Sequence, residues 1–269
     1  MTTKLVICDI DATLVNEKKE LTPRTKKDLI QLHEKGIYFG IASGRPADEL
    51  KRNKEYWDLP FDFDFVVGMN GAELWGGVHQ KFYSYFMMKK EWLKETMEIM
   101  KVVKCNPMIY WNGKIRCVHI DDWMIHSATT SHKELEVVKL EDFYAHENAK
   151  IMFRMKEEDM PKAEAWVKEH PNPYYHGFKT QSTLLEFCDK RINKGYGLKK
   201  ICELNDLDIK DVMAFGDTSN DNDMLKVAGC GVCMINGTDD TKACANAITK
   251  QDNDHDGLAI YLEESGILC

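Results

Sequence analysis

The sequence lacks the features that define membrane and secreted proteins. Its 269 residues contain no apolar run of about 18 residues, the length that a membrane-spanning helix requires. Before Asp9 there is only a short apolar stretch, too brief for the core of a signal peptide. We therefore expect neither a membrane span nor a secretory leader.

An excess of positive charge is also missing. The chain has 36 lysines and arginines against 44 aspartates and glutamates, which gives 36 − 44 = −8. Nucleic acids and anionic membranes are bound through basic surfaces, so we expect neither as a partner. An acidic protein that acts on anions needs a local cation, either a lysine or a metal ion.

The nine cysteines do not form a disulfide framework, because their number is odd and their spacing irregular. This favours a reduced, cytoplasmic protein. Cys230 and Cys233 have the C-x-x-C spacing of redox and zinc sites, but no second pair exists. Since they adjoin a short apolar segment, we interpret them as core residues.

Strand and helix signals alternate at both ends of the chain. Residues 4–8 form a short apolar run typical of a strand buried on both faces, and Thr22-Pro23 is a strong helix start. Further strands are predicted at residues 37–42, 63–67, 212–215 and 231–234, with helices at 196–204 and 221–228. Strand–helix–strand order at this spacing indicates a parallel α/β sheet.

The middle of the chain has a different pattern. Asn112-Gly113, between two apolar segments, predicts a β-hairpin with a type I′ turn. Helices are predicted at residues 91–104 and 161–169, and strands at 149–155, 174–179 and 184–188. This order predicts an α+β sheet with helices on one side. We expect a core of residues 1–79 and 189–269, with a cap of residues 80–188 inserted between its halves.

Polar clusters follow four of the predicted core strands. They are Asp9-Ile10-Asp11, Ser43-Gly44-Arg45, Asn70-Gly71 and Gly216-Asp217. Because the carboxyl ends of strands in an open α/β sheet form the ligand crevice, these clusters are expected to meet. Together with Asp221, the aspartates suit a hard cation such as Mg²⁺.

Each cluster also has a simpler interpretation when it is taken alone. Asp9 and Asp11 could merely end a strand, because such short motifs often occur without function. Ser43 could be an ordinary helix cap, or it could bind phosphate at a helix N-terminus. Lys194 could be solvated, or it could share that phosphate. Single motifs leave these alternatives open.

Taken together, residues 9–13, 42–46, 194–195 and 216–224 resemble the four motifs of the haloacid dehalogenase-like (HAD) superfamily. The resemblance is closest to its Cof-type phosphatases, which carry a class IIB cap between motifs two and three. It implies a HAD-like Rossmannoid three-layer parallel-sheet core with an inserted α+β cap. One departure is Ala12, where most relatives have glycine, a position that mainly concerns backbone room.

The resemblance also implies a mechanism. Asp9 would attack phosphorus and form an aspartyl-phosphate, while Asp11 would protonate the leaving group and then activate water. Mg²⁺ would be held by Asp9, the backbone carbonyl of Asp11, and Asp217. Residues implied in phosphate or substrate binding are Ser43, Gly44, Arg45, Asn70, Lys194 and Asn220. Thr13 and Asp221 would contact and orient these residues without touching the substrate themselves.

The expected reaction is hydrolysis of a small phosphorylated metabolite, with sugar phosphates as the leading class and no obligate protein partner. A phosphomutase of sugar phosphates is the alternative, because the same cap type occurs in a phosphomannomutase branch of the superfamily. Six cap residues are candidates to contact the leaving group: Trp111, Arg116, His119, Arg154, His176 and Lys179.

A third hypothesis is a calcium-responsive binding protein without catalysis. Asp252, Asp254, Asp256, Gly257 and Glu263 match every specified position of an EF-hand loop. However, an EF-hand needs a helix before its loop, and residues 243–249 predict at best a short one. The segment also resembles the HAD tail, in which residues 258–263 form the last helix.

Overall fold

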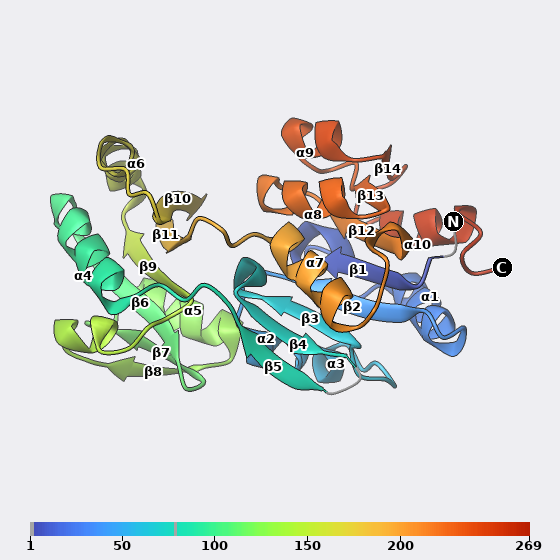
Figure 1. Ribbon diagram of the computed structural model, residues 1–269, viewed down its shortest axis with the longest axis horizontal. Coiled ribbons are helices and arrows are strands. Elements are labelled where there is room, and N and C mark those ends of the chain that lie inside the picture. The colour runs from blue at the N-terminus through green and yellow to red at the C-terminus, as the bar shows by residue number, and fades with distance from the viewer. Residues whose placement is uncertain (1–2, 78–79) are drawn as a thin grey trace. The chain divides into compact units, whose positions relative to one another are not determined.

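The computed structural model describes residues 3–77 and 80–269, which divide into two units (Figure 1). The core unit comprises Met1–Tyr83 and Ile192–Cys269, and the cap unit comprises Ser84–Arg191. The cap predicted from the sequence, residues 80–188, begins four residues before this unit and ends three residues before it, inside a strand.

Eight strands of the described residues form the core sheet. In spatial order they are β14 (Ala247–Ile248), β13 (Cys230–Cys233), β12 (Val212–Gly216), β1 (Leu5–Asp9), β2 (Tyr38–Ala42), β3 (Phe65–Gly68), β4 (Glu73–Gly76) and β5 (Lys81–Ser84). Neighbouring strands from β14 to β3 are parallel, and β4 is antiparallel to β3. The predicted parallel core is therefore confirmed, with an antiparallel addition that carries the sheet up to the start of the cap.

Helices cover both faces of this sheet. They are α1 (Pro23–Glu34), α2 (Ala47–Leu50), α3 (Asn53–Tyr56), α7 (Lys194–Leu204), α8 (Asn222–Val227), α9 (Asp239–Cys244) and α10 (Gly257–Glu264). Val66 of β3 belongs to the apolar cluster formed with α1 and α10. The next residue, Val67, points to the opposite face, as successive residues of a strand do. There it lies against α7, since a side chain at Gly197 of that helix would come within 2.7 Å of it. The core therefore has the predicted three layers.

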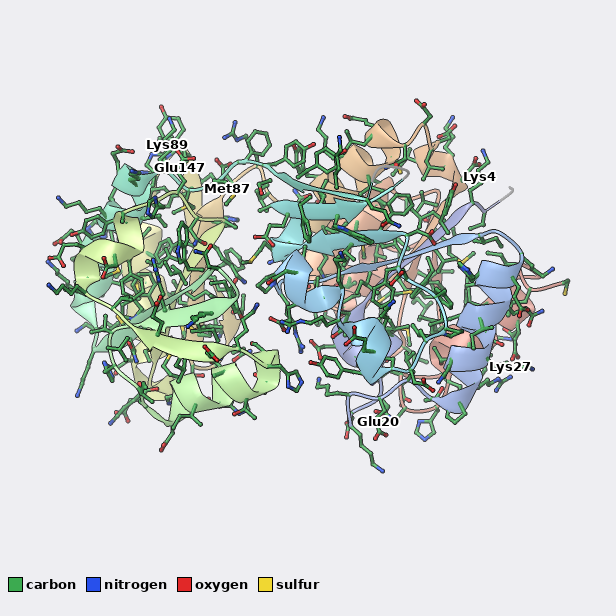
Figure 2. All side chains as sticks on the ribbon, turned by 90° about the horizontal axis from the view of Figure 1, so that it is seen from below. Lys4, Glu20, Lys27, Met87, Lys89 and Glu147 are labelled. Carbon is green, nitrogen blue, oxygen red and sulfur yellow. The ribbon has the colours of Figure 1, made fainter. Side chains whose placement is uncertain are left out.

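Local signals explain where α1 begins and which residues face water. Thr22 accepts a hydrogen bond from the backbone amide of Thr25, and proline occupies the first turn, as predicted. Charged side chains such as Lys4, Glu20 and Lys27 point outward from the core unit (Figure 2).

Six strands of the described residues form the cap sheet. In spatial order they are β10 (Tyr175–Gln181), β11 (Leu184–Asp189), β9 (Lys150–Met155), β6 (Cys105–Trp111), β7 (Lys114–Cys117) and β8 (Glu134–Val137). The β6–β7 hairpin turns at Asn112 and Gly113, whose φ angles of 47° and 76° are both positive. A type I′ turn requires this conformation, so the predicted hairpin is confirmed.

The prediction that helices cover one side of the cap sheet is wrong in one respect. Helices α4 (Lys90–Ile99) and α6 (Met160–Glu169) pack on the face that carries Ile151 and Phe153. Helix α5 (Asp122–Ser131) packs instead with Met152, which points to the opposite face. The cap sheet is therefore covered on both faces, in part.

Every helix among residues 3–77 and 80–269 is too short or too polar to cross a membrane.

Candidate active site

Two adjacent strands bring together aspartates that lie far apart in the sequence. Asp9 is the last residue of β1, and Asp217 directly follows β12, which pairs with β1 in parallel. Asp221 lies one turn further along the chain. Asp9 and Asp217 are buried, and Asp221 has no exposed surface. One carboxylate oxygen from each lies within 4.8 Å of the others. The predicted convergence at the carboxyl edge of the sheet is thus present.

Lys194 lies among these carboxylates. It is the first residue of α7 and is fully buried. Its ammonium group donates a hydrogen bond to Oδ1 of Asp9 and another, of 2.6 Å, to Oδ1 of Asp221. The alternative in which Lys194 is merely solvated is therefore wrong.

Asp221 also closes the loop that follows β12. Its second oxygen, Oδ2, accepts hydrogen bonds from the backbone amides of Asp217 (3.0 Å) and Thr218 (3.2 Å). A side chain at Gly216 would come within 2.5 Å of the Asp221 side chain, so glycine is required for this approach. Asp221 therefore fixes both the loop and the lysine.

The burial of these groups changes their proton affinities. Burial raises the pKa of Asp9 well above its ordinary value; Lys194 opposes this effect, and Asp221 and Asp217 add to it. Burial, followed by the charge of Asp221, raises the pKa of Asp217 to about 6. For Lys194, burial lowers the pKa, but Asp221 and Asp9 outweigh it and the pKa is raised. The site thus holds more negative charge than its one buried lysine balances.

The donor set suits a divalent cation. Asp9, Asp217 and Asp221 form the group of possible metal ligands found in the described part of the chain. Their oxygens are the ligands that hard divalent ions prefer, and such an ion would relieve the excess negative charge. The hydroxyl of Thr13 donates a 3.0 Å hydrogen bond to Oδ1 of Asp217, which orients that carboxylate. The carboxylate of Asp11 is outside the cluster, which leaves its backbone carbonyl as the predicted donor.

Asp11 points to a different environment from Asp9. After β1 the backbone turns, with Ala12 in the left-handed region at φ 59°. The Asp11 carboxylate forms ion pairs with Lys19 (2.7 Å) and Arg45 (3.2 Å) and is 41% exposed. Burial raises the pKa of Asp11, but Arg45 and Lys19 outweigh it, so its pKa lies below the ordinary value. The two aspartates therefore lie in different electrostatic environments.

The second and third clusters lie against each other. The backbone amide of Asn70 donates a 3.0 Å hydrogen bond to the carbonyl of Ser43, and the Asn70 amide group lies beside Gly44. The side chain of Asn220 donates a 3.5 Å hydrogen bond to Oδ1 of Asn70. Ser43 is buried and does not cap α2, whose first turn follows Pro46. The helix-cap interpretation of Ser43 is therefore not supported.

Lys19 is a site residue that the sequence analysis missed. It lies in a tight turn of residues 16–20, whose backbone is closed by hydrogen bonds between Asn16 and Glu20 and between Lys19 and Asn16. Loop residues follow no periodicity, and Lys19 is preceded by another lysine. The only signal was its place shortly after the Asp9–Asp11 motif.

The EF-hand-like segment supports this turn. Asp254 accepts a 2.8 Å hydrogen bond from the backbone amide of Glu17, and Asn253 donates one of 2.9 Å to the carbonyl of Val15. Asp256 accepts a hydrogen bond from Thr22. These side chains thus connect residues 15–22 to residues 253–256 by hydrogen bonds.

The same contacts do not favour calcium. An EF-hand directs its carboxylates to one ion, whereas Asp254, Asp256 and Glu263 each contact a different partner, the last being Arg24. The segment is preceded by the short strand β14 rather than by a long helix.

Cys230 and Cys233 lie in β13, half-buried and buried, and pack within the core.

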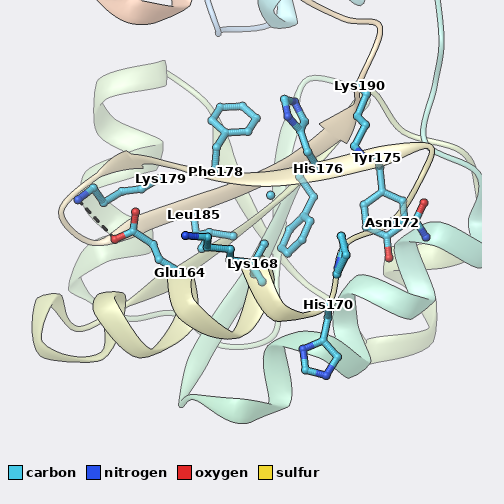
Figure 3. A pocket seen from close by; sticks show the side chains of 14 residues that line it. Glu164, Lys168, His170, Asn172, Tyr175, His176, Phe178, Lys179, Leu185 and Lys190 are labelled. Carbon is cyan, nitrogen blue, oxygen red and sulfur yellow. Dashed lines mark ion pairs between the residues drawn. The ribbon is translucent and has the colours of Figure 1, made fainter.

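The six cap candidates have partners within the cap. Trp111 stacks on His146, Arg116 pairs with Glu136, His119 with Asp121, Arg154 with Gln181 and Thr183, His176 with Cys188, and Lys179 with Glu164. His176 and Lys179 are among the residues that line a cavity of about 570 Å³ between α6 and β10. Figure 3 shows both side chains, with Lys179 paired to Glu164 of α6. The lining of the cavity includes the apolar side chains of Leu185 and Phe187.

The core has three layers, and carboxylates and a lysine meet at the carboxyl edge of its sheet. This arrangement places the chain among the α/β enzymes. Within this class, the family model of the haloacid dehalogenase-like hydrolases matches residues 6–262, and the chain belongs to that family. The resemblance found in the four motifs is thereby confirmed.

Individual relatives agree over nearly the whole chain. A 5-amino-6-(5-phospho-D-ribitylamino)uracil phosphatase of Bacillus subtilis is 26% identical over 270 residues, covering 97% of this chain and 96% of the relative. The crystal structure of a haloacid dehalogenase-like hydrolase from Bacteroides thetaiotaomicron is 25% identical, covers 98% and 100%, and has a TM-score of 0.87. A structure described as a HAD subclass IIB sugar phosphatase is 22% identical, covers 98% and 100%, and has a TM-score of 0.82.

Proposed function

We propose that this protein is a Mg²⁺-dependent phosphatase that hydrolyses small phosphomonoesters, such as sugar phosphates, through an aspartyl-phosphate intermediate. The observation that carries the proposal is the contact between Lys194 and Asp9 beside Asp217 and Asp221. A buried carboxylate held by a lysine at the edge of an α/β sheet is suited to nucleophilic attack on an anion.

In the first step, a carboxylate oxygen of Asp9 forms a bond to phosphorus as the bond from phosphorus to the ester oxygen breaks. Asp11 gives its proton to the departing alkoxide. Lys194, together with Ser43 and the backbone amide of Gly44, stabilises the charge on the phosphoryl oxygens.

In the second step, water attacks phosphorus, its proton passes to Asp11, and the bond from phosphorus to Asp9 breaks. Inorganic phosphate leaves and Asp9 is regenerated. Mg²⁺, held by Asp9, Asp217 and the carbonyl of Asp11, would screen the repulsion between the nucleophile and the phosphate. Asn70, Asn220 and Arg45 border the same edge of the sheet and would contact the substrate.

The proposed substrate class follows from the relatives. The Bacillus relative is named for a phosphorylated ribitylamino compound, and one structural neighbour is described as a sugar phosphatase. Both names describe enzymes that act on small phosphorylated compounds. We extend this class to the present chain, and we keep the cytoplasmic setting and the lack of an obligate protein partner as expectations from composition.

A panel of phosphorylated metabolites, assayed with Mg²⁺ for phosphate release, tests the proposal. We expect release from at least one sugar phosphate, and Asp9→Asn should abolish it because the nucleophile is lost. Release by Asp9→Asn at nearly the wild-type rate would exclude the covalent mechanism.

The same assay separates hydrolysis from the phosphomutase alternative. A mutase returns the phosphoryl group to the sugar, so it would isomerise mannose or glucose phosphates without releasing phosphate. Membership of a hydrolase family does not favour the non-catalytic calcium-binding hypothesis.

A further inference from the structure

Asp11 lies between two cations that differ in how their charge is balanced. Arg45 donates hydrogen bonds to both carboxylate oxygens of Asp11, and its other nitrogen lies 3.7 Å from Glu49, which is buried behind it. Within the described residues, the ion pair with Asp11 is the only one that Lys19 forms. The charge of Arg45 is therefore shared between two acids, whereas that of Lys19 rests on Asp11.

The position of Lys19 relative to the reacting atoms follows from Asp11. A group that protonates a leaving oxygen must come within about 2.6–3.2 Å of it. The ammonium of Lys19 lies 2.7 Å from Oδ1 of Asp11. Where Oδ1 is the oxygen that contacts the leaving group, Lys19 lies within about 6 Å of the ester oxygen of a bound substrate.

Lys19 is also free to take a second partner. Its side chain is 62% exposed, and an ammonium group has three donors, of which Asp11 uses one. Val15 and Glu17, which lead into the turn that carries Lys19, are fixed to Asn253 and Asp254, so the backbone that places the ammonium beside Asp11 is supported. A positioned, partly solvated cation of this kind attracts an anion more than a neutral hydroxyl.

From this geometry we infer that Lys19 is a specificity-determining residue for substrates whose leaving group carries a carboxylate near the ester oxygen. The inference rests on the proposed phosphatase function and narrows its substrate class. A carboxylate within a few bonds of the ester oxygen reaches Lys19 while the ester oxygen contacts Asp11. Phosphorylated short hydroxy acids meet this requirement.

Two substrates of nearly the same shape test the inference. 3-Phosphoglycerate and glycerol 3-phosphate differ in a carboxylate against a hydroxymethyl group at the position that Lys19 would contact. The kcat/KM for each is measured with Mg²⁺ for the wild type, Lys19→Met and the matched control Lys18→Met. p-Nitrophenyl phosphate, with Asp9→Asn as blank, reports the phosphatase function itself.

We expect the wild type to prefer 3-phosphoglycerate, and Lys19→Met to lower the ratio of the two kcat/KM values about tenfold. This magnitude is typical of a charge-assisted hydrogen bond that remains partly exposed. Lys18→Met should keep the wild-type ratio. Added salt should reduce the preference of the wild type but not that of Lys19→Met, because salt screens exposed charges.

Several outcomes would overturn the inference. If Lys19→Met slows both substrates equally, Lys19 only positions Asp11 and does not select the substrate. If the wild type hydrolyses p-nitrophenyl phosphate through Asp9 but shows no preference for the acid, the specificity is wrong and the function stands. If no substrate yields activity that depends on Asp9, the proposed function itself fails.

Discussion

The hydroxyl of Thr13 donates a 3.0 Å hydrogen bond to Oδ1 of Asp217, across 204 positions of the sequence. This bond connects the turn after β1 to the loop after β12. Both partners are buried, so water does not replace the bond easily. Thr13 therefore orients a carboxylate that we place at the metal.

Thr13→Val should weaken Mg²⁺ activation. Valine keeps the shape of threonine but removes the donor, and the loss of such a supporting bond typically costs about 10–100-fold in metal affinity or activity. The Mg²⁺ concentration for half-maximal phosphatase activity measures the effect. Thr13→Ser, which retains the hydroxyl, should stay near the wild type. Equal Mg²⁺ dependence in all three proteins would contradict this role.

Lys194→Met should destabilise the protein when no metal is present. Removing one partner of a buried ion pair leaves the other charge uncompensated and typically costs about 3–5 kcal/mol. Urea unfolding in EDTA measures this loss, and added Mg²⁺ should reduce it because the ion supplies the missing positive charge. Lys199→Met, on the exposed side of the same helix, serves as control. A loss that Mg²⁺ does not change would argue against a cation at the carboxylates.

Ala12→Gly should stabilise the protein. Ala12 has φ 59°, a left-handed conformation that costs an L-residue about 1–2 kcal/mol and glycine almost nothing. Since glycine gains entropy in the unfolded chain, we expect a net gain of about 0.5–1 kcal/mol in the free energy of unfolding. At Ala245, with φ −85°, the same change should instead destabilise. A loss of stability in Ala12→Gly would show that the methyl group makes contacts that outweigh the strain.

Asp28 in α1 should make stability depend on pH. Burial, followed by the charge of Glu263, raises its pKa from 3.8 to about 6. The folded protein thus binds this proton more tightly than the unfolded chain does. The contribution of Asp28 to stability is therefore greatest below about pH 4, and it falls as the pH rises to about 6.

Asp28→Asn removes this titration. The free energy of unfolding of Asp28→Asn minus that of the wild type should increase between pH 4 and pH 7. Urea unfolding at several pH values measures it. A difference that stays constant over this range would show that Asp28 titrates normally.

The core and its site could be predicted because both leave local signals. Strands buried on both faces appear as short apolar runs, and Asp9 and Asp217 follow such runs directly. The cap left weaker signals. Helix α5 was not predicted because its apolar residues do not lie on one face: Trp123 and Ile125 are about half exposed, whereas Met124 is buried.

The contacts that complete the site could not be derived from sequence patterns. Lys19, Asn253 and Asp254 lie in loops, where neither helical nor strand periodicity applies. Their partners are distant in the sequence, and Asp254 contacts the backbone of Glu17, which any residue could provide. The EF-hand-like spacing therefore reflected a loop that fastens two ends of the chain.

The insertion of the cap determines the order in which the protein can be built. β1 and β12 are neighbours in the core sheet, yet the whole cap sequence, Ser84–Arg191, is synthesised between them. The cap is continuous, so it can complete its sheet as the chain emerges, whereas β1 pairs early with β2 but lacks its second neighbour until β12 follows. Asp9 is among the first residues made and meets Asp217 only near the end. The enzyme therefore gains its chemistry in the last stage of synthesis, after its cap exists.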